Sequence, residues 1–505
     1  MNKLVVQLLT LLCKIDWKKL FIIVATTRII VLIIQVTLSS RSNSSQVKLA
    51  HELHYWSSPH ISPLPSTTFN SSSHVLKGVQ ISKTKPRPSR KSKRERKSRV
   101  DELFVSLPNP RPQTPPTPLQ KYMSSLSPVD ALMYAKNELK HAQVLTEDSD
   151  LYAPIFKNVT LFKRSYELME LMLKVYIYED GHRPIFHQPH LSGIYASEGW
   201  FMKLLQENKQ FVTKDAARAH LFYLPYSARQ LQQALYVQGS HNLAPLSFFL
   251  RDYVNSLASK YPFWNRTRGT DHFLVACHDW GPYTLKEHAE LLNNTIKALC
   301  NADLSEGIFK PEKDISFPET SIRTPKRPHR NIGGGLRVSQ RPFLAFFAGN
   351  MHGRVRPMLL KHWHNKDEKM RIYGPLPRTK MPYIQHMKSS KFCICPMGFE
   401  VNSPRIVEAI YYECVPVIIA DHFVPPLDAV LDWTAFSVVV AENDIPKLKE
   451  ILEAIPLRRY LVMLGNLKML QRHFLWNFRP VKYDLFHMVL HSIWLTRLNQ
   501  IQIPE

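Results

Sequence analysis

The sequence predicts an α/β protein with two parallel-sheet halves that face a cleft, and three observations predict this fold class. Short apolar segments alternate with amphipathic ones between residues 171 and 300, as strands alternate with helices in such proteins. A polar link rich in Pro and Arg, residues 317–341, separates this stretch from a second alternating stretch. The second stretch contains a strand–helix–strand pattern at 392–421, which requires parallel strands and a right-handed crossover.

The first half is expected to span residues 151–335. Runs of β-branched and aromatic residues indicate its strands, and apolar residues three and four positions apart indicate its helices. The expected strands are 174–178, 220–225 and 272–277, and the expected helices are 198–206, 246–259 and 286–300.

The second half is expected to span residues 336–455, and a helical, aromatic tail at 456–505 is expected to pack back on the body. Asp444 is the expected N-cap of the last helix in this half. The expected strands are 343–347, 371–373 and 437–440, and the expected helices are 354–362, 383–388 and 447–454.

The strand–helix–strand unit of the second half indicates a ligand site. Its strands are expected at 392–395 and 414–420, and Asn402 or Ser403 can cap a helix whose first residue is Pro404. Ligands of parallel sheets bind at the carboxyl ends of the strands, where helix N-termini point. The free amides and the positive end of the helix dipole favour a phosphate or pyrophosphate group there.

A membrane anchor is expected near the N-terminus. Residues 20–38 are mostly apolar, and a helix of this length nearly matches a hydrocarbon core of about 30 Å. Arg28 in its middle costs roughly 3 kcal/mol on insertion scales, which the surrounding apolar residues outweigh. Lysines within residues 1–19 favour a cytosolic tail and a luminal body. We favour this uncleaved signal anchor over a cleaved signal peptide, because no convincing small-residue cleavage site follows.

Residues 39–150 are expected to form a largely disordered stem, because Ser, Pro, Lys and Arg dominate their composition. Asp148 and Asp150 form a D-x-D pattern that can bind metal ions in other contexts. We interpret it as a solvated acidic turn, since no strand precedes it. N-glycosylation sequons agree with a luminal body, and their acceptor residues are Asn43, Asn70, Asn158, Asn265 and Asn293.

The formal net charge of +25 raises the question of nucleic-acid binding. The charge is unevenly placed, because a dense basic run lies between Lys83 and Arg99. Such a run is typical of a solvated, disordered segment. We therefore expect no nucleic-acid partner and keep a basic nucleic-acid-binding protein as the weaker alternative.

The cysteines lack the spacing of a structural zinc site. Cys393 and Cys395 are interpreted as core residues that share one side of a strand. A disulfide between Cys277 and Cys300 is compatible with the sequence, which does not assign it.

Four blocks between about residues 170 and 495 resemble the exostosin-type glycosyltransferases (the GT47 type), in particular their plant branch. The blocks are 174–179, 271–282, 346–356 and 395–421, and their order and spacing make the match specific. The resemblance implies a type II Golgi membrane protein whose luminal body has the GT-B fold, with two Rossmann-like domains. It also implies an inverting hexosyl- or pentosyltransferase that moves a sugar from a nucleotide sugar to a cell-wall polysaccharide, such as a hemicellulose or a pectin side chain, or to a related glycan.

An inverting transfer needs a held diphosphate, an aligned acceptor and a base, but no covalent nucleophile. The second half is expected to hold the donor. Ser403 and the helix amides are expected to bind the diphosphate, Arg405 to neutralise the leaving group, and Glu408 to accept hydrogen bonds from the ribose. The alternative is an Arg405–Glu408 surface ion pair, worth roughly a few tenths of a kcal/mol. The other candidate donor-binding residues are Gly349, Arg354, Arg356, Gly398 and Glu400.

The general base is expected at His278 or Asp279, which follow a strand end in the first half and face the expected cleft. Equally, these side chains can cap turns and satisfy buried amides. No metal or other cofactor is expected to be essential, because the D-x-D pattern lies in the stem.

A non-catalytic scaffold for other Golgi glycosyltransferases is the main rival hypothesis, since such a protein would keep the fold and lose the donor chemistry. The expected partners are a nucleotide sugar, a polysaccharide acceptor, the Golgi membrane and other glycosyltransferases in complexes. The sequence specifies neither the donor sugar nor the acceptor.

Overall fold

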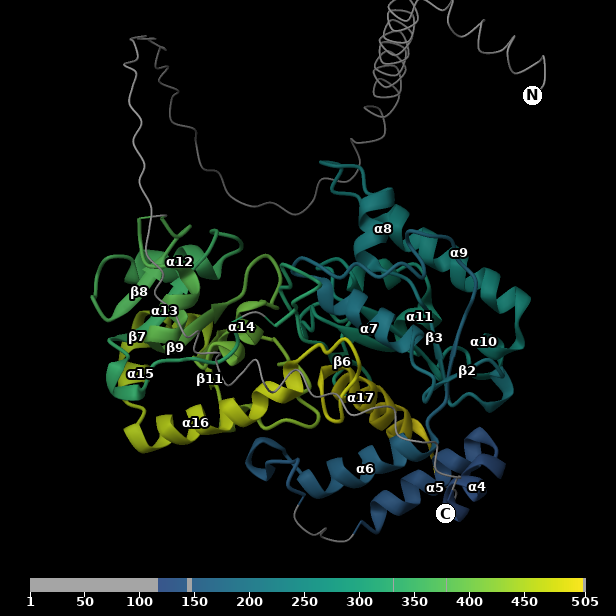
Figure 1. Cartoon of the computed structure of the whole chain (residues 1–505). Helices are drawn as coiled ribbons and strands as arrows, with labels where there is room; N and C mark the ends of the chain where they lie inside the picture. Colours follow the sequence, from purple (N-terminus) through teal and green to yellow (C-terminus); the bar gives the residue numbers. More distant parts are fainter. Residues whose placement is uncertain (1–116, 143–147, 330, 378, 503–505) are drawn as a thin grey trace, which may run out of the picture. The chain divides into compact units, whose positions relative to one another are not determined.

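The computed structural model describes residues 117–142, 148–329, 331–377 and 379–502, which Figure 1 shows as coloured ribbons. Two all-parallel sheets organise these residues, as the alternating pattern predicts. The expected membrane segment at 20–38, most of the expected stem, and Asn43 and Asn70 lie outside the described residues. Within the described ranges, no helix is both long and apolar enough to cross a membrane.

The first sheet has six parallel strands in the order β2-β1-β3-β4-β5-β6. The strands are β1 (Val175–Ile177), β2 (Val212–Thr213), β3 (Leu221–Tyr223), β4 (His272–Ala276), β5 (Ile296–Leu299) and β6 (Ile315–Ser316). The expected helix at 286–300 is wrong. Helix α11 (Ala289–Asn293) is short, and β5 follows it because its residues are buried on both faces of the sheet.

The second sheet has five parallel strands in the order β11-β10-β9-β7-β8. The strands are β7 (Phe343–Ala348), β8 (Met370–Tyr373), β9 (Ser390–Pro396), β10 (Val415–Ile419) and β11 (Val438–Val439). The expected strand–helix–strand unit is confirmed, because α14 (Arg405–Tyr411) connects β9 to β10 and these strands pair in parallel.

Alternating side chains place the first sheet between two apolar layers. Phe273 and Val275 of β4 belong to the core that also covers the second sheet, whereas Leu274 and Ala276 belong to a separate core on the other face. A strand with both faces buried has a continuous apolar sequence, which explains the pattern at 272–277.

The helices cover these sheets. Between β1 and β7 they are α7 (Ala196–Gln206), α8 (Ala228–Leu235), α9 (Ala244–Lys260), α10 (Pro262–Thr267) and α11. In the second half they are α12 (Val355–Trp363), α13 (Tyr383–Ser389), α14, α15 (Leu448–Glu453), α16 (Leu457–Leu470) and α17 (Leu485–Gln500). Asp444 does not cap α15, because a 3₁₀ turn at Glu442–Lys447 precedes that helix.

Part of the expected stem is folded. Helices α4 (Pro118–Ser125), α5 (Pro128–Lys140) and α6 (Val159–Met172) precede β1, and α5 buries Leu132 and Ala135 against the core. The acidic turn is confirmed as a turn, but Asp148 is partly buried and accepts a hydrogen bond from the Tyr483 hydroxyl at 3.3 Å. Residues 118–140 and 148–150 therefore belong to the body.

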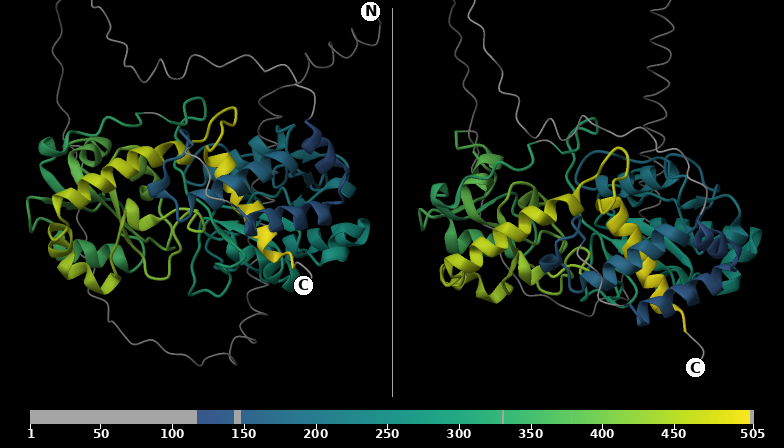
Figure 2. Two further views of the ribbon diagram at one scale, coloured as in Figure 1. Left: turned by 90° about the horizontal axis from the view of Figure 1, so that it is seen from below. Right: turned by 60° about the horizontal axis from the view of Figure 1, so that its bottom comes forward.

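Helix α17 returns to the first sheet after the second half is complete. It contacts α5, α6, β5 and β6, and Figures 1 and 2 show it lying against α6. Its faces are almost wholly buried, including Phe486 and Trp494. The tail therefore packs back on the body as expected.

Two disulfides join neighbouring strands near their ends. Cys277–Cys300 connects the residues that follow β4 and β5, and Cys393–Cys414 connects β9 to the residue before β10. Interpreting Cys393 as a simple core residue was incomplete, whereas Cys395 is a buried free thiol. The first bridge holds together the two chain segments that lead into the candidate site.

Candidate active site

The candidate site lies where the carboxyl ends of the two sheets contact each other. The first sheet supplies Asp279 after β4, Asn301 after β5 and Glu319 after β6. The second sheet supplies the loop after β7 and residues 397–405 after β9. This is the edge at which open parallel sheets bind their ligands.

Two side-chain hydrogen bonds connect the sheets at this place. The Asn301 amide donates to a Glu400 carboxylate oxygen at 2.9 Å, and the Asn402 amide donates to Glu319 at 2.7 Å. Asn402 is therefore turned toward the first sheet and does not cap α14, whose N-cap is Pro404 without a side-chain cap. The expected capping by Asn402 is wrong, and Pro404 is the N-cap and not the first helical residue, while the Ser403 hydroxyl accepts hydrogen bonds from the amide and the guanidinium of Arg405.

Arg405 lies against the end of β7. Its Nη2 and Nε atoms donate to the Ala348 carbonyl at 3.0 and 3.3 Å, and its guanidinium lies 5.1 Å from the centre of the Phe347 ring. A Cβ atom at Gly349 would clash with this guanidinium, so the glycine leaves room for it. Ser403 is buried, and its hydroxyl accepts a long hydrogen bond of 3.4 Å from the Arg405 amide.

Glu408 does not pair with Arg405 within the described residues. Its carboxylate accepts a hydrogen bond from the Tyr383 hydroxyl at 2.8 Å. Burial raises the pKa of Glu408, and Tyr383 and Arg405 partly offset that effect. The described part of the chain therefore does not contain the Arg405–Glu408 surface ion pair that was the alternative to donor binding.

Arg356 is buried between the loops that follow β7 and β9. It donates to the Met397 carbonyl at 3.1 Å and to the Asn350 carbonyl at 3.2 Å, and a Cβ at Gly398 would clash with its guanidinium. Burial and the nearby Arg405 lower the pKa of Arg356 to about 10. Two guanidinium groups thus lie side by side at the ends of β7 and β9, which is an arrangement suited to an anion.

Arg354 is held away from this pair. Its Nε and Nη2 atoms each donate to a Glu442 carboxylate oxygen at 2.7 Å, and Glu442 also accepts the Asp421 amide hydrogen at 3.1 Å. The two expected arginines of this loop therefore have different partners, and only Arg356 joins Arg405.

Asp279 and His278 differ in their suitability as a base. Burial raises the pKa of Asp279, while Tyr195, Asn402 and Arg356 act in the opposite direction. His278 is buried against Tyr195, its Nδ1 accepts the Trp280 amide hydrogen at 3.1 Å, and burial lowers its pKa to about 3. His278 is therefore a weak base that already accepts a hydrogen bond.

Glu319 is a carboxylate that the sequence did not single out. It is 4% exposed, and burial together with the nearby Asp279 raises its pKa well above the usual range. Arg405 lies close enough to act in the opposite direction. Glu319 lies in the link interpreted as polar, and β6 before it has only two residues, so periodicity gave no signal.

Glu400 lies at the acidic side of the site. Burial, followed by the nearby Glu306 and Asp279, raises its pKa to about 7. Glu306 itself accepts a hydrogen bond from the Tyr283 hydroxyl. Arg356 and Arg405 thus form an arginine side of the site and Glu306 and Glu400 a carboxylate side, and Asp279 lies near both sets.

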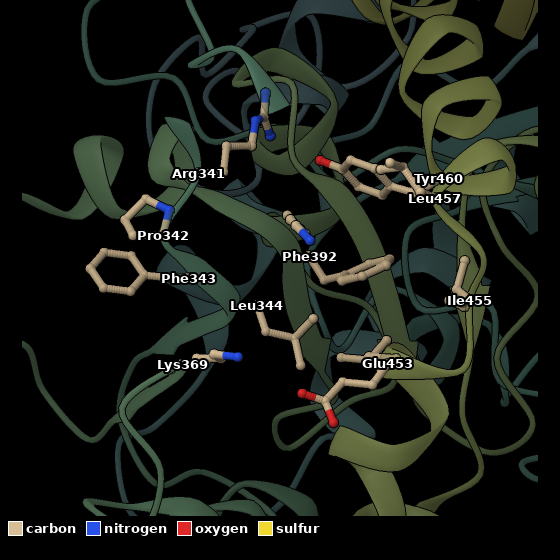
Figure 3. A pocket seen from close by; sticks show the side chains of 12 residues that line it. Arg341, Pro342, Phe343, Leu344, Lys369, Phe392, Glu453, Ile455, Leu457 and Tyr460 are labelled. Atoms are coloured by element: carbon tan, nitrogen blue, oxygen red, sulfur yellow. The ribbon is translucent and has the colours of Figure 1, made fainter. Parts of the chain in front are cut away.

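No group of three or more His, Cys, Asp or Glu side chains within the described ranges is arranged to hold a metal ion. A cavity of about 350 Å³ lies at the amino ends of β7 and β9, lined by Arg341, Phe392 and Tyr460 among others (Figure 3). It contains none of the candidate site residues, because they follow the opposite ends of these strands.

The described sequon asparagines are all exposed. Asn158 caps α6, Asn265 lies in α10, and Asn293 ends α11. Their positions leave the three side chains at the surface, where glycan attachment requires them.

A family model described as "Exostosin GT47 domain" matches residues 169–455. A probable glycosyltransferase of Arabidopsis thaliana is 44% identical over 391 residues, which cover 76% of this chain and 74% of the relative. A probable glucuronosyltransferase of Oryza sativa subsp. japonica is 30% identical over an alignment that covers 64% of this chain and 77% of the relative. The probable beta-1,4-xylosyltransferase IRX10L of Arabidopsis thaliana is 29% identical, with coverages of 64% and 81%.

Among solved structures, the crystal structure of TarM gives an alignment that covers 51% of this chain and 58% of the TarM chain. The sequence identity is 12% and the TM-score is 0.25, a score too low to define the fold.

Proposed function

Because the chain belongs to the exostosin GT47 family and is a glycosyltransferase, we propose that it inverts the anomeric carbon while it moves a sugar from a nucleotide sugar to a cell-wall polysaccharide. We propose the GT-B arrangement for its two parallel-sheet halves. The xylosyl- and glucuronosyltransferase names of two relatives support sugar transfer of this general kind.

The arginine side of the site suits the donor. Arg356 and Arg405 lie at the ends of β9 and β7, where they would neutralise the diphosphate as its bond to the sugar breaks. Ser403, Gly349 and Gly398 would form the walls of this donor site. Tyr383 holds Glu408 at 2.8 Å, and the free carboxylate oxygen would accept the ribose hydroxyls.

The carboxylate side suits the acceptor, and Asp279 is the base in this proposal. The acceptor hydroxyl oxygen forms the bond to the anomeric carbon, the bond to the diphosphate breaks on the opposite face, and Asp279 takes the hydroxyl proton. Glu319 lies near both Asp279 and Arg405 and accepts a hydrogen bond from Asn402, so it would position the loop after β9 beside the base. His278 is disfavoured because its basicity is low and its Nδ1 is engaged.

One observation carries the proposal. The Asn301 amide of the first sheet donates both to the Asp279 carbonyl at 3.4 Å and to Glu400, in the loop after β9, at 2.9 Å. Across this contact, Arg356 lies near enough to Asp279 to lower the pKa of its carboxyl. A base and a leaving-group stabiliser from different sheets thus meet at one place, as an in-line displacement between two bound substrates requires.

We also propose a Golgi-luminal body with a type II anchor. The apolar segment at 20–38 and the exposed sequons at Asn158, Asn265 and Asn293 support this topology. Digestion of the protein by an endoglycosidase, with loss of apparent mass, would test it.

The enzymatic test uses purified full-length protein, a panel of nucleotide sugars and neutral oligosaccharide acceptors. The expected result is transfer from one donor, with the product anomer inverted in its NMR spectrum and Arg405→Ala strongly impaired. A folded protein that turned over none of the donors would support the scaffold hypothesis, and a product with retained configuration would overturn the proposed mechanism.

A further inference from the structure

Phe399 is a large apolar side chain that is 69% exposed beside the candidate site. It lies between Gly398 and Glu400, and its ring stacks on His352 with centroids 4.6 Å apart and planes at 17°. A single exposed apolar side chain is ordinary at a protein surface, so the neighbours of Phe399 decide what its ring can bind. The stacking partner defines which face of the Phe399 ring is free.

The loops that carry Phe399 and His352 are fixed against each other. Gly353 has a positive φ of 66°, and a Cβ atom there would clash with the Gly398 carbonyl. The two backbones therefore approach closely, next to the buried guanidinium of Arg356. The Phe399 ring is exposed and yet held by a rigid support.

A second aromatic group follows the candidate base in the first sheet. Trp280 is partly buried, with its ring 4.5 Å from Tyr236 and 5.4 Å from His278. Phe399 and Trp280 thus each adjoin a carboxylate residue of the site, Glu400 and Asp279 respectively.

Asn301 connects the two aromatic positions. Its amide donates to Glu400 at 2.9 Å and to the Asp279 carbonyl at 3.4 Å. Its side-chain oxygen has no hydrogen-bond partner within the described ranges, and the residue is 1% exposed. His352 also lies close enough to Asp279 to lower its pKa. The residues next to the two rings, Glu400 and Asp279, are therefore joined through Asn301.

The charge around these rings indicates the class of ligand. Asp303, Glu306 and Glu400 lie near one another, so a phosphate would be repelled on this side. Carboxylate and amide oxygens accept hydrogen bonds from hydroxyl groups, and the negative face of an aromatic ring attracts the C–H groups of a pyranose. These are the recognition groups for a neutral sugar.

We propose that Phe399, supported by His352, and Trp280 form an acceptor subsite that stacks against the pyranose rings of a neutral oligosaccharide. This inference rests on the proposed function and deepens it, because it assigns the acceptor to the carboxylate side and the donor to the arginine side. Phe399 is the more accessible of the two rings and carries the test.

The experiment measures binding of the β-1,4-linked hexasaccharides xylohexaose and galactohexaose to full-length wild type, Phe399→Ala and Phe399→Tyr by calorimetry. We expect Phe399→Ala to weaken binding of the preferred hexasaccharide about tenfold and Phe399→Tyr to restore it. Val439→Ala is the matched control, because Val439 is 66% exposed on β11 and should leave binding unchanged.

Steady-state kinetics provides the second measurement. Phe399→Ala should raise KM for the acceptor about tenfold and change KM for the donor less than twofold. Equal changes in both constants, unchanged acceptor binding, or tighter binding of a galacturonic acid hexamer than of the neutral probes would overturn the subsite.

The outcomes separate this inference from the proposed function. A wild type that turns over a nucleotide sugar and binds neither neutral hexasaccharide would overturn the subsite alone. Hexasaccharide binding that depends on Phe399 without any turnover would overturn the enzymatic mechanism alone. Absence of both binding and turnover would overturn both.

Discussion

Glu319 accepts a hydrogen bond from the Asn402 amide at 2.7 Å, and this contact joins the link after the first sheet to the loop after β9. Both residues are buried, and the Asn402 side-chain oxygen has no partner within the described ranges. The contact places a carboxylate of the first half next to Asp279 and Arg405.

Asp279→Asn should lower kcat by a factor of about 10²–10⁴, because the amide cannot take a proton from the acceptor. Burial raises the pKa of Asp279, so wild-type activity should fall as the pH drops through that raised value and the carboxylate is protonated. A pH profile of kcat/KM would show this acid limb. Glu319→Gln should retain the acid limb of the pH profile and lower kcat less than Asp279→Asn does. A larger loss of kcat in Glu319→Gln, together with loss of the acid limb, would assign the base to Glu319.

Arg405→Lys should lower kcat about 10²-fold or more while the fold is retained. A lysine cannot bind the Ala348 carbonyl through two donors and also lie flat on Phe347. Arg354→Lys is the control, since Arg354 is exposed and bound to Glu442. Comparable rate losses in both variants would mean that Arg405 has no special part in the reaction.

The stability of Glu400→Gln, compared with that of the wild type, should be higher at high pH than at low pH. The folded-state pKa of Glu400 is raised to about 7 from 4.5, so the folded state binds a proton that the unfolded state releases. Stability from this group is complete below about pH 4.5 and is lost as the pH rises through 7. The side chain is partly exposed, so solvent screening leaves a difference of about 1 kcal/mol between pH 5 and pH 8. Thermal unfolding of both proteins across this range measures it, and parallel curves would show that the shift is absent.

Removal of the Cys277–Cys300 bridge by alanine substitution should lower the free energy of unfolding by about 3 kcal/mol, given the sequence separation of 23 residues. It should also lower kcat, because the bridge immediately precedes His278 and Asn301. The Cys393–Cys414 pair, with a separation of 21 residues, is the matched control for stability. Denaturant unfolding would compare the stabilities of the two variants, and rates measured at equal folded fractions would compare their kcat values. Equal losses of kcat in both variants would contradict a special positioning effect of the Cys277–Cys300 bridge.

Local patterns predicted the parts of the fold whose signal lies within one segment. The unit from β9 to β10 combines two buried strands with a short helix, and the structure confirms it. The alternation after residue 171 likewise predicted β1, β3 and β4. β5 was missed because Ile296–Leu299 directly follows a helical turn, so its apolar residues continued a helix-like pattern.

The site was less accessible to sequence reasoning because its contacts join distant segments. Nothing local connects Asn402 to Glu319 or Asn301 to Glu400, which are 83 and 99 residues apart. Arg354 and Arg356 have the same charge and nearly the same position, yet one binds Glu442 and the other is buried beside Gly398. The partner of each arginine is therefore set by the tertiary fold and cannot be predicted from the local sequence.

The return of α17 to the first sheet has a consequence for synthesis. The core that contains Val175 and Phe273 also contains Phe486 and Trp494, so its packing is incomplete until α17 has left the ribosome. Domains commonly fold as their N-terminal parts emerge, but this first half must wait for its last helix with apolar surface exposed. Chaperones that bind exposed apolar surface would act during that interval, before Cys277 and Cys300 are joined in the finished fold.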